Sequence, residues 1–188
     1  MKSLIIFFTL SISIFTFADT GLLIVRPMEV EGFEGSSAVK LDVSFELLEK
    51  VVNSEEFKNR VVNFKNSKGE RKFASNQGLS NEQIYARFMD GRETLQPQTA
   101  GEMNLFLKLY HRPWSKVIGW TNGDINTIHI NWRFFKNFNP WDVAGNLAHE
   151  WIHKLGFGHT SAKEHDSVPY AIGYIVRDLG EKFQKSGK

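Results

Sequence analysis

The feature that most constrains this chain is the segment from His149 to His159, which reads HEWIHKLGFGH. His149 and His153 are four residues apart, so on an α-helix their imidazoles project from one face, one turn apart. Two neutral ring nitrogens placed in this way can bind one Zn²⁺ at roughly 2.0–2.1 Å. Gly156 can adopt the left-handed conformation that ends a helix, and the turn brings His159 back as a third ligand. Three protein ligands leave one tetrahedral position open, as catalytic zinc sites do.

Glu150 follows the first histidine and is the candidate catalytic residue. Its carboxylate cannot easily share the metal, but it can reach a water bound there and act as a general base. The five fixed positions would occur together by chance on the order of 10⁻⁵ in a chain of this size. We therefore predict that His149, His153 and His159 are metal ligands and that Glu150 is the base.

Apolar periodicity on both sides of this segment predicts strands and helices in one domain. Ser80 is expected to cap a helix that Gly91 ends, and Asn139-Pro140 to open the helix that carries the histidines. Pro27 should place the first strand at a sheet edge or end it early. We expect strands over residues 22–30, 71–74, 103–109, 117–121 and 127–132, helices from residues 41, 54, 80, 139 and 169, a loop over 31–38, a solvated turn over 65–72 and a hairpin turn at 122–124. The predicted class is α/β (α+β), with helices packed against a mixed twisted sheet.

The first eighteen residues have the organisation of a secretory signal peptide. A lysine follows the initiating methionine, an apolar stretch runs from Leu4 to Phe17, and Ala18 offers a small residue where a signal peptidase would cut. A membrane anchor is the alternative, but the stretch is shorter than the ~20 residues of a span. We expect residues 1–18 to be cleaved, leaving residues 19–188 as one secreted or periplasmic domain without a membrane anchor.

Composition narrows the class further. The chain has no cysteine, which excludes disulfides, a lipoprotein anchor and a cysteine that blocks the metal. An exported domain without disulfides is typical of bacteria. The formal net charge is +2 and both signs are interspersed, so no nucleic-acid partner is expected. We expect a monomer that is stabilised by its core and its metal.

With His149, Glu150, His153, Gly156 and His159 in place, the chain resembles the metzincin clan of zinc metallopeptidases. The order of elements is similar as well: strands, a helix with the motif, a short loop and a last helix. The resemblance implies a zincin-like fold with an active-site helix and a small C-terminal lobe. It also implies cleavage of a protein or peptide substrate, and it assigns no subfamily.

One stretch departs from that family. Metzincins carry a methionine turn beneath the zinc, whereas no methionine follows Met103 here. The corresponding stretch should be residues 166–170, where either Val168 or Pro169 could replace the methionine as an apolar floor. Tyr170 could then stabilise the oxyanion or act as a fifth ligand, or it could be a half-buried core tyrosine.

The other histidines have no partner at a ligand spacing. His165 and Asp166 fall in a polar stretch and are expected to face solvent, and His111 should be a strand or loop residue. His129 falls in the strand expected nearest the motif helix, where metzincins line the substrate cleft. Residues 160–168 would border the pocket after the cleaved bond in that family and so influence substrate choice.

The function we expect is that of a zinc-dependent endopeptidase, in which zinc and Glu150 act together on a bound water. Two alternatives are an inactive binding module that keeps zinc as a structural staple and a zinc amidase that acts on peptidoglycan peptides. The intact glutamate argues against the inactive module, because a decayed enzyme has no reason to retain the base.

Overall fold

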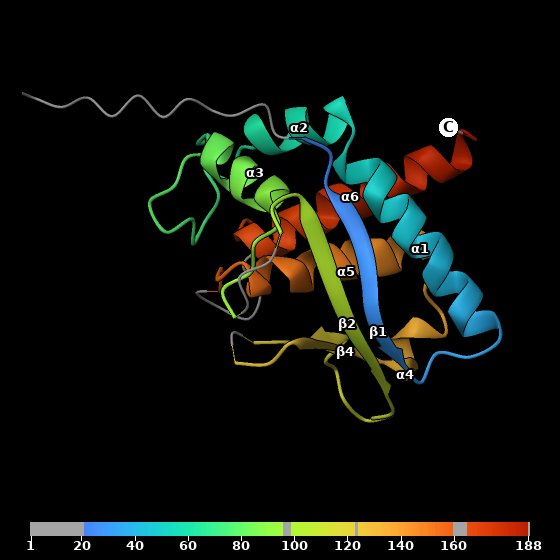
Figure 1. Ribbon diagram of the computed structural model, residues 1–188. Helices are drawn as coiled ribbons and strands as arrows, with labels where there is room; N and C mark the ends of the chain where they lie inside the picture. Colours follow the sequence, from blue (N-terminus) through green and yellow to red (C-terminus); the bar gives the residue numbers. More distant parts are fainter. Residues whose placement is uncertain (1–20, 96–98, 123, 160–164, 188) are drawn as a thin grey trace, which may run out of the picture.

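The computed structural model describes residues 21–95, 99–122, 124–159 and 165–187, which form helices and one sheet (Figure 1). The elements are β1 (Ile24–Glu31), α1 (Ser36–Val52), α2 (Glu55–Val62), α3 (Asn81–Asp90), β2 (Glu102–Tyr110), β3 (Gly119–Trp120), β4 (Thr127–Asn131), α4 (Trp132–Phe135), α5 (Pro140–Lys154) and α6 (Val168–Lys185). This mixture confirms the predicted α/β class. The expected signal peptide lies outside the described residues. Among the described helices, none has the length and apolar character that a bilayer span requires.

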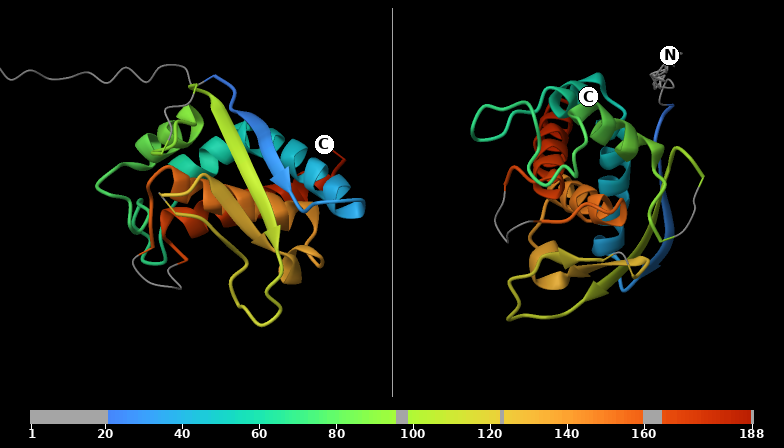
Figure 2. Two further views of the ribbon diagram at one scale, coloured as in Figure 1. Left: turned by 60° about the horizontal axis from the view of Figure 1, so that its bottom comes forward. Right: turned by 90° about the vertical axis from the view of Figure 1, so that its left-hand side faces the viewer.

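The sheet has the order β1-β2-β4-β3, with β1, β2 and β4 parallel and β3 antiparallel to β4. Met103, Leu105 and Leu107 alternate along β2 with less buried residues, as the periodicity predicted. Pro27 lies in an edge strand, beside an irregularity in the pairing register, because proline cannot donate to a sheet ladder. Helices α1, α5 and α6 lie on one side of the curved sheet (Figure 2).

Helices α5 and α6 cross at two glycines. A Cβ added to Gly145 would lie 2.7 Å from the Gly173 carbonyl oxygen, and one added to Gly173 would lie 2.9 Å from that of Gly145. Residues without side chains therefore allow the two backbones to touch. This close approach also brings α6 against His149, whose Cβ would be 3.1 Å from a Cβ at position 173.

Several predicted helix boundaries are confirmed by capping contacts. The Ser54 hydroxyl accepts from the Phe57 amide at the start of α2, and Ser80 and Gln83 form a capping box at α3. Gly91 ends α3 in the left-handed conformation. An Asn139 capping box with Asp142 opens α5, and Pro140 is its first residue, as predicted.

Other boundaries differ from expectation. Helix α1 begins at Ser36 rather than at residue 41, because the Ser37 hydroxyl bonds to the backbone of Glu34 and fixes the first turn. Residues 71–74 form no strand; only Ala74 makes an isolated bridge, to Ser167.

The predicted strands at 117–121 and 127–132 are also shorter than expected. Strand β3 is limited to Gly119–Trp120, since the Val117 carbonyl accepts a bond from the Asn131 side chain. Trp132 belongs to α4, because the Asn131 side chain caps that helix by accepting from the Arg133 amide. Outside these elements, the basic run at 65–72 is mostly exposed, as expected.

Candidate metal centre

Three histidines come together at the C-terminal end of α5. One ring nitrogen from each of His149, His153 and His159 lies within 4.8 Å of the other two, so the three could hold a metal ion. The Nε2 atoms of His153 and His159 are 3.1 Å apart. Two ligands of a tetrahedral zinc are separated by about 3.3–3.4 Å when each bond is about 2.0–2.1 Å. The donor spacing therefore fits one small ion, and the predicted ligand set is brought together.

The turn after α5 brings the third histidine back. Gly156 has φ +91°, its amide donates to the His153 carbonyl at 3.0 Å, and the Phe157 amide donates to the Ile152 carbonyl at 3.2 Å. These two bonds define a Schellman motif, in which the left-handed residue is nearly always glycine. Phe157 is 2% exposed and packs in the core, which anchors the turn. The predicted role of Gly156 is confirmed.

Each histidine has a further hydrogen bond that fixes its ring. The Nδ1 of His153 donates to the Phe157 carbonyl at 2.7 Å, and the Nδ1 of His159 lies 3.2 Å from the Ser167 hydroxyl. His149 bonds to the backbone of Pro169. Such partners orient metal-binding imidazoles and set which nitrogen is free to bind.

Burial keeps the imidazoles of His149 and His153 neutral. It lowers the pKa of His149 to about 3, helped by the neighbouring His153 and His159, and it lowers the pKa of His153 as well. A histidine must be neutral to donate its lone pair to a metal. The electrostatics of the cluster therefore favour metal binding over protonation.

The side chain of Glu150, which follows His149 on α5, packs against β3. It is 3% exposed, and burial raises the pKa of its carboxyl to about 8, against smaller opposing effects from the Asn146 side chain and the Thr121 backbone. A Cβ added to Gly119 would come within 3.0 Å of the Glu150 Oε1 atom. Glycine at that point of β3 thus leaves room for the carboxylate. Asn146, four residues earlier on the same helix, was not predicted, because no motif or spacing marks it.

Tyr170 packs directly on the ligands. Its ring stacks on His159 with centroids 4.6 Å apart and meets His149 edge-on at 4.7 Å. The side chain is half-buried, as one of the two expectations for it stated. Val168, at the start of α6, is fully buried. The stretch predicted to lie beneath the metal is therefore adjacent to the histidines.

Donors from residues 77–94 hold the end of α5. The Thr94 amide donates to the Lys154 carbonyl at 3.0 Å, Arg87 Nε to the Leu155 carbonyl at 3.0 Å, and Gln77 Nε2 to the Gly156 carbonyl at 2.7 Å. These carbonyls have no partner within the helix and would otherwise need water. The segment therefore fixes the turn that carries the third histidine.

A buried ion pair supports the same helix end. Lys154 Nζ lies 2.9 Å from a Glu93 carboxylate oxygen, with side chains 2% and 0% exposed, and also donates to the Ile125 carbonyl at 2.6 Å. No spacing in the sequence pointed to this pair, because its members are far apart along the chain. A buried ion pair contributes little net stability, so we interpret this pair as a contact that holds the end of α5 in position.

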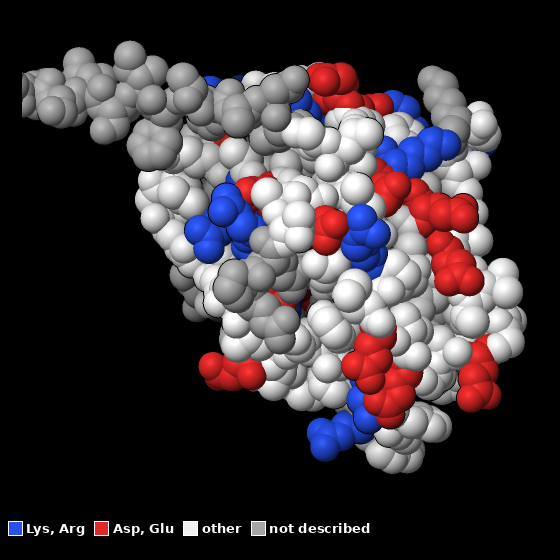
Figure 3. All heavy atoms as spheres, in the orientation of Figure 1, with Lys and Arg blue, Asp and Glu red and all other residues white. Residues whose placement is uncertain are grey.

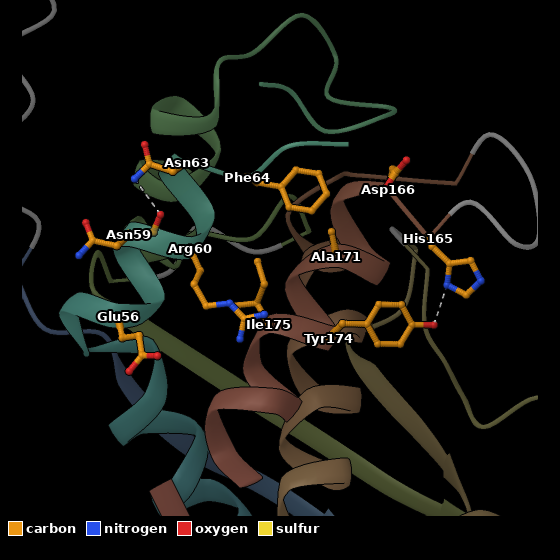
Figure 4. A pocket seen from close by; sticks show the side chains of 10 residues that line it. All are labelled: Glu56, Asn59, Arg60, Asn63, Phe64, His165, Asp166, Ala171, Tyr174 and Ile175. Atoms are coloured by element: carbon orange, nitrogen blue, oxygen red, sulfur yellow. Dashed lines mark hydrogen bonds between the residues drawn. The ribbon is translucent and has the colours of Figure 1, made fainter. Parts of the chain in front are cut away.

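A cavity of about 790 Å³ lies between α2 and α6, outside the metal centre (Figure 4). Phe64, His165 and Tyr174 line part of it, and none of the three metal-ligand candidates does. His165 is exposed, as predicted, and its Nδ1 is 3.1 Å from the Tyr174 hydroxyl. Asp166, also predicted to face solvent, is half-buried instead because its carboxylate accepts from the Ser67 amide at 2.8 Å.

The two remaining histidines lie away from the cluster. His111 is exposed. His129 stacks on Trp120, with centroids 4.1 Å apart, and alternates along β4 with the buried Ile128 and Ile130. Strand β3 packs against α5, and His129 lies on β4, the strand that pairs with β3.

Comparison with known proteins yields no relative: no family model, no curated protein and no solved structure matches this chain. The chemistry of the centre therefore rests on its own residues. Three of them could hold a metal ion, and the buried Glu150 follows the first of them in the sequence.

Proposed function

We propose that this protein is a zinc-dependent endopeptidase of the metzincin type. The observation that carries the proposal is the convergence of three histidine nitrogens within 4.8 Å while Glu150, next to the first of them, is kept and buried. A purely structural zinc site has four protein ligands, whereas three histidines leave a position open to substrate.

Zinc is the proposed metal because of the donor chemistry. The cluster offers imidazoles alone and the chain has no thiolate to offer, a set that suits zinc and several other transition metals. Among these, zinc favours four-coordinate geometry with three protein ligands in hydrolytic sites. Zinc, when bound, supplies a Lewis acid that polarises the scissile carbonyl and lowers the pKa of water.

The protein's own residues would transfer the proton and stabilise the charge that develops during hydrolysis. The Glu150 carboxyl would be kept ionised by the positive charge of a zinc ion held by the three histidines, because that charge lowers its pKa. The carboxylate then takes the proton of the attacking water and passes it to the leaving amine, which balances the hydrolysis of one peptide bond. The Asn146 side chain and the Thr121 backbone hold that carboxylate by hydrogen bonds. Tyr170, whose ring contacts two of the candidate ligands, would stabilise negative charge on the carbonyl oxygen through its hydroxyl group.

The test is chelator-sensitive hydrolysis by purified protein. We expect about one zinc per chain in metal analysis, lost in a His149→Ala/His153→Ala variant, and cleavage of casein that a chelator abolishes. Glu150→Gln should keep the metal and the fold yet lose at least ~10²-fold in rate, the usual scale of general-base catalysis. Glu46→Gln, an exposed change on α1, is the matched control and should cleave like wild type.

The same assay run on cell-wall sacculi separates the alternatives. Chelator-sensitive release from sacculi with intact casein would identify an amidase. Zinc bound at one per chain with neither substrate attacked would identify the inactive binding module. Either result overturns the endopeptidase proposal.

A further inference from the structure

Residues 111–118 join β2 to β3 and project from one end of the sheet (Figures 1 and 2). At their centre, Trp114 is 93% exposed. Val117, Ile118 and Trp120 follow within six residues and are also exposed. A soluble domain rarely leaves so large an aromatic ring in water beside other exposed apolar side chains, and a group of this kind marks an interaction site.

The loop that carries Trp114 is held in place from below. Asn131 is fully buried; its Oδ1 accepts from the Arg112 amide at 3.4 Å, and its Nδ2 donates to the carbonyls of Arg112 and Val117 at 3.1 and 3.2 Å. Arg133 Nη1 donates to the Ser115 carbonyl at 2.9 Å. The exposed ring is therefore presented on a preorganised backbone, which lowers the entropy lost on binding.

The sequence around this loop is basic. Between Glu102 and Asp142 the chain carries one acidic residue, Asp124, and the basic residues Lys108, Arg112, Lys116, Arg133 and Lys136, of which Lys108 is paired with Glu31 on β1. Arg112 and Lys116 flank Trp114 and both are exposed. At the lower end of Figure 3 the outermost charged side chains are blue, with acidic side chains next to them toward the sheet. The two cations would contact negative charge while the indole between them contacts an apolar layer.

We propose that residues 111–118 dock the protein on an anionic phospholipid surface, with the Trp114 ring at the headgroup level. Tryptophan is enriched at the headgroup level of membranes, because its ring is apolar and its N–H is polar. Arg112 and Lys116 would neutralise lipid phosphates. A projecting loop can insert one aromatic ring into a bilayer without needing a surface of complementary shape. A protein partner would need about 800 Å² of matching surface on this side.

The test is co-sedimentation with vesicles of phosphatidylglycerol and phosphatidylcholine, beside vesicles of phosphatidylcholine alone. Wild type should bind the anionic vesicles, bind the neutral ones weakly, and release in high salt. Trp114→Ala should weaken binding about tenfold, since the ring is the main apolar contact. Arg112→Ala/Lys116→Ala should weaken it about 30-fold, at roughly fivefold per cation.

Lys58→Ala/Lys65→Ala is the matched control, because it removes the same charge from exposed positions on and after α2. It should bind as wild type does, and all variants should melt with wild type because the changed side chains are exposed. The docking surface is refuted if wild type ignores anionic vesicles, if it binds sacculi in their place, or if the loop variants and the control weaken binding equally. None of these readouts depends on hydrolysis.

Discussion

At the scale of single residues, Ser167 shows how a side chain can orient a candidate metal ligand without being one itself. It stands at the N-cap of α6 but makes no capping bond with its side chain. Its hydroxyl is fully buried and lies 3.2 Å from the Nδ1 of His159. The hydroxyl that would ordinarily satisfy the helix start is therefore used to orient the third histidine.

Ser167→Ala should lower metal affinity about tenfold, the lower end of the effect of losing a partner behind a ligand. The fold should persist, because only one oxygen is removed. Competition with a chromogenic chelator measures the affinity. Ser44→Ala is the control: Ser44 is equally buried, but its hydroxyl donates to the Lys40 carbonyl within α1. Unchanged affinity in Ser167→Ala would show that the His159 ring is held by its other contacts.

Val168 belongs to the same scale: it and Pro169, both buried, are the two residues predicted to replace the methionine that metzincins carry beneath the zinc. If Val168 acts only as an apolar floor, Val168→Met should cost at most about 1–2 kcal/mol of overpacking. Val168→Asp should be far worse, because it buries an unpaired carboxylate close to the ligands and should reduce zinc content as well as stability. Thermal melts and metal analysis check both. Equal zinc content and equal melting temperature in Val168→Asp and wild type would contradict the proposed role.

At the scale of elements, the crossing of α5 and α6 decides where the histidines lie. Gly173→Ala would place a methyl group 2.9 Å from the Gly145 carbonyl oxygen and 3.1 Å from the His149 Cβ. Because neither backbone can yield without moving a helix, we expect a loss of about 1–3 kcal/mol in stability and a weaker metal site.

Urea unfolding and metal titration of Gly173→Ala test this expectation. Gly158→Ala is the control: it lies between two of the ligands in sequence, yet an added Cβ there meets nothing within 4 Å. If both variants behave like wild type, the glycine contact does not govern the distance between the helices.

The helices and strands also show which element boundaries could be predicted from the sequence. Boundaries at Ser80, Gly91 and Pro140 were predicted because capping and backbone preferences act over a few residues, although the local Ser37–Glu34 contact that starts α1 was missed. Boundaries set by distant contacts were not predicted. The 117–121 strand is cut short by Asn131, whose side chain takes the Val117 carbonyl.

The same division holds at the metal centre. His149, His153 and His159 were predicted because one helix and one turn bring them together, which spacing alone expresses. Ser167 and the Lys154–Glu93 pair could not be predicted, since their contacts depend on how separate segments pack. Spacing predicted the candidate ligands, whereas the Ser167 contact that orients His159 depends on how separate segments pack.

At the scale of the whole molecule, the centre joins parts that are remote in the chain. Helix α5 supplies two histidines, α6 supplies the residues behind them, and residues 77–94 hold the turn between. A metal bound there would link α5 to the turn that leads to α6. The described part of the chain has no disulfide to do the same. Metal binding should therefore stabilise the whole fold.

Metal removal should accordingly lower the melting temperature of the entire domain in one transition. Free zinc at a thousandfold excess over its Kd contributes about 4 kcal/mol to a fold that binds it only when native. For a chain of this size that corresponds to roughly 8–16 °C. Calorimetry of wild type before and after chelation, then after zinc is restored, measures the shift and its reversal. The His149→Ala/His153→Ala variant should have a melting temperature close to that of chelated wild type, and added zinc should not change it. A chelated wild type that melts at its original temperature would mean that the three histidines meet without holding the fold together.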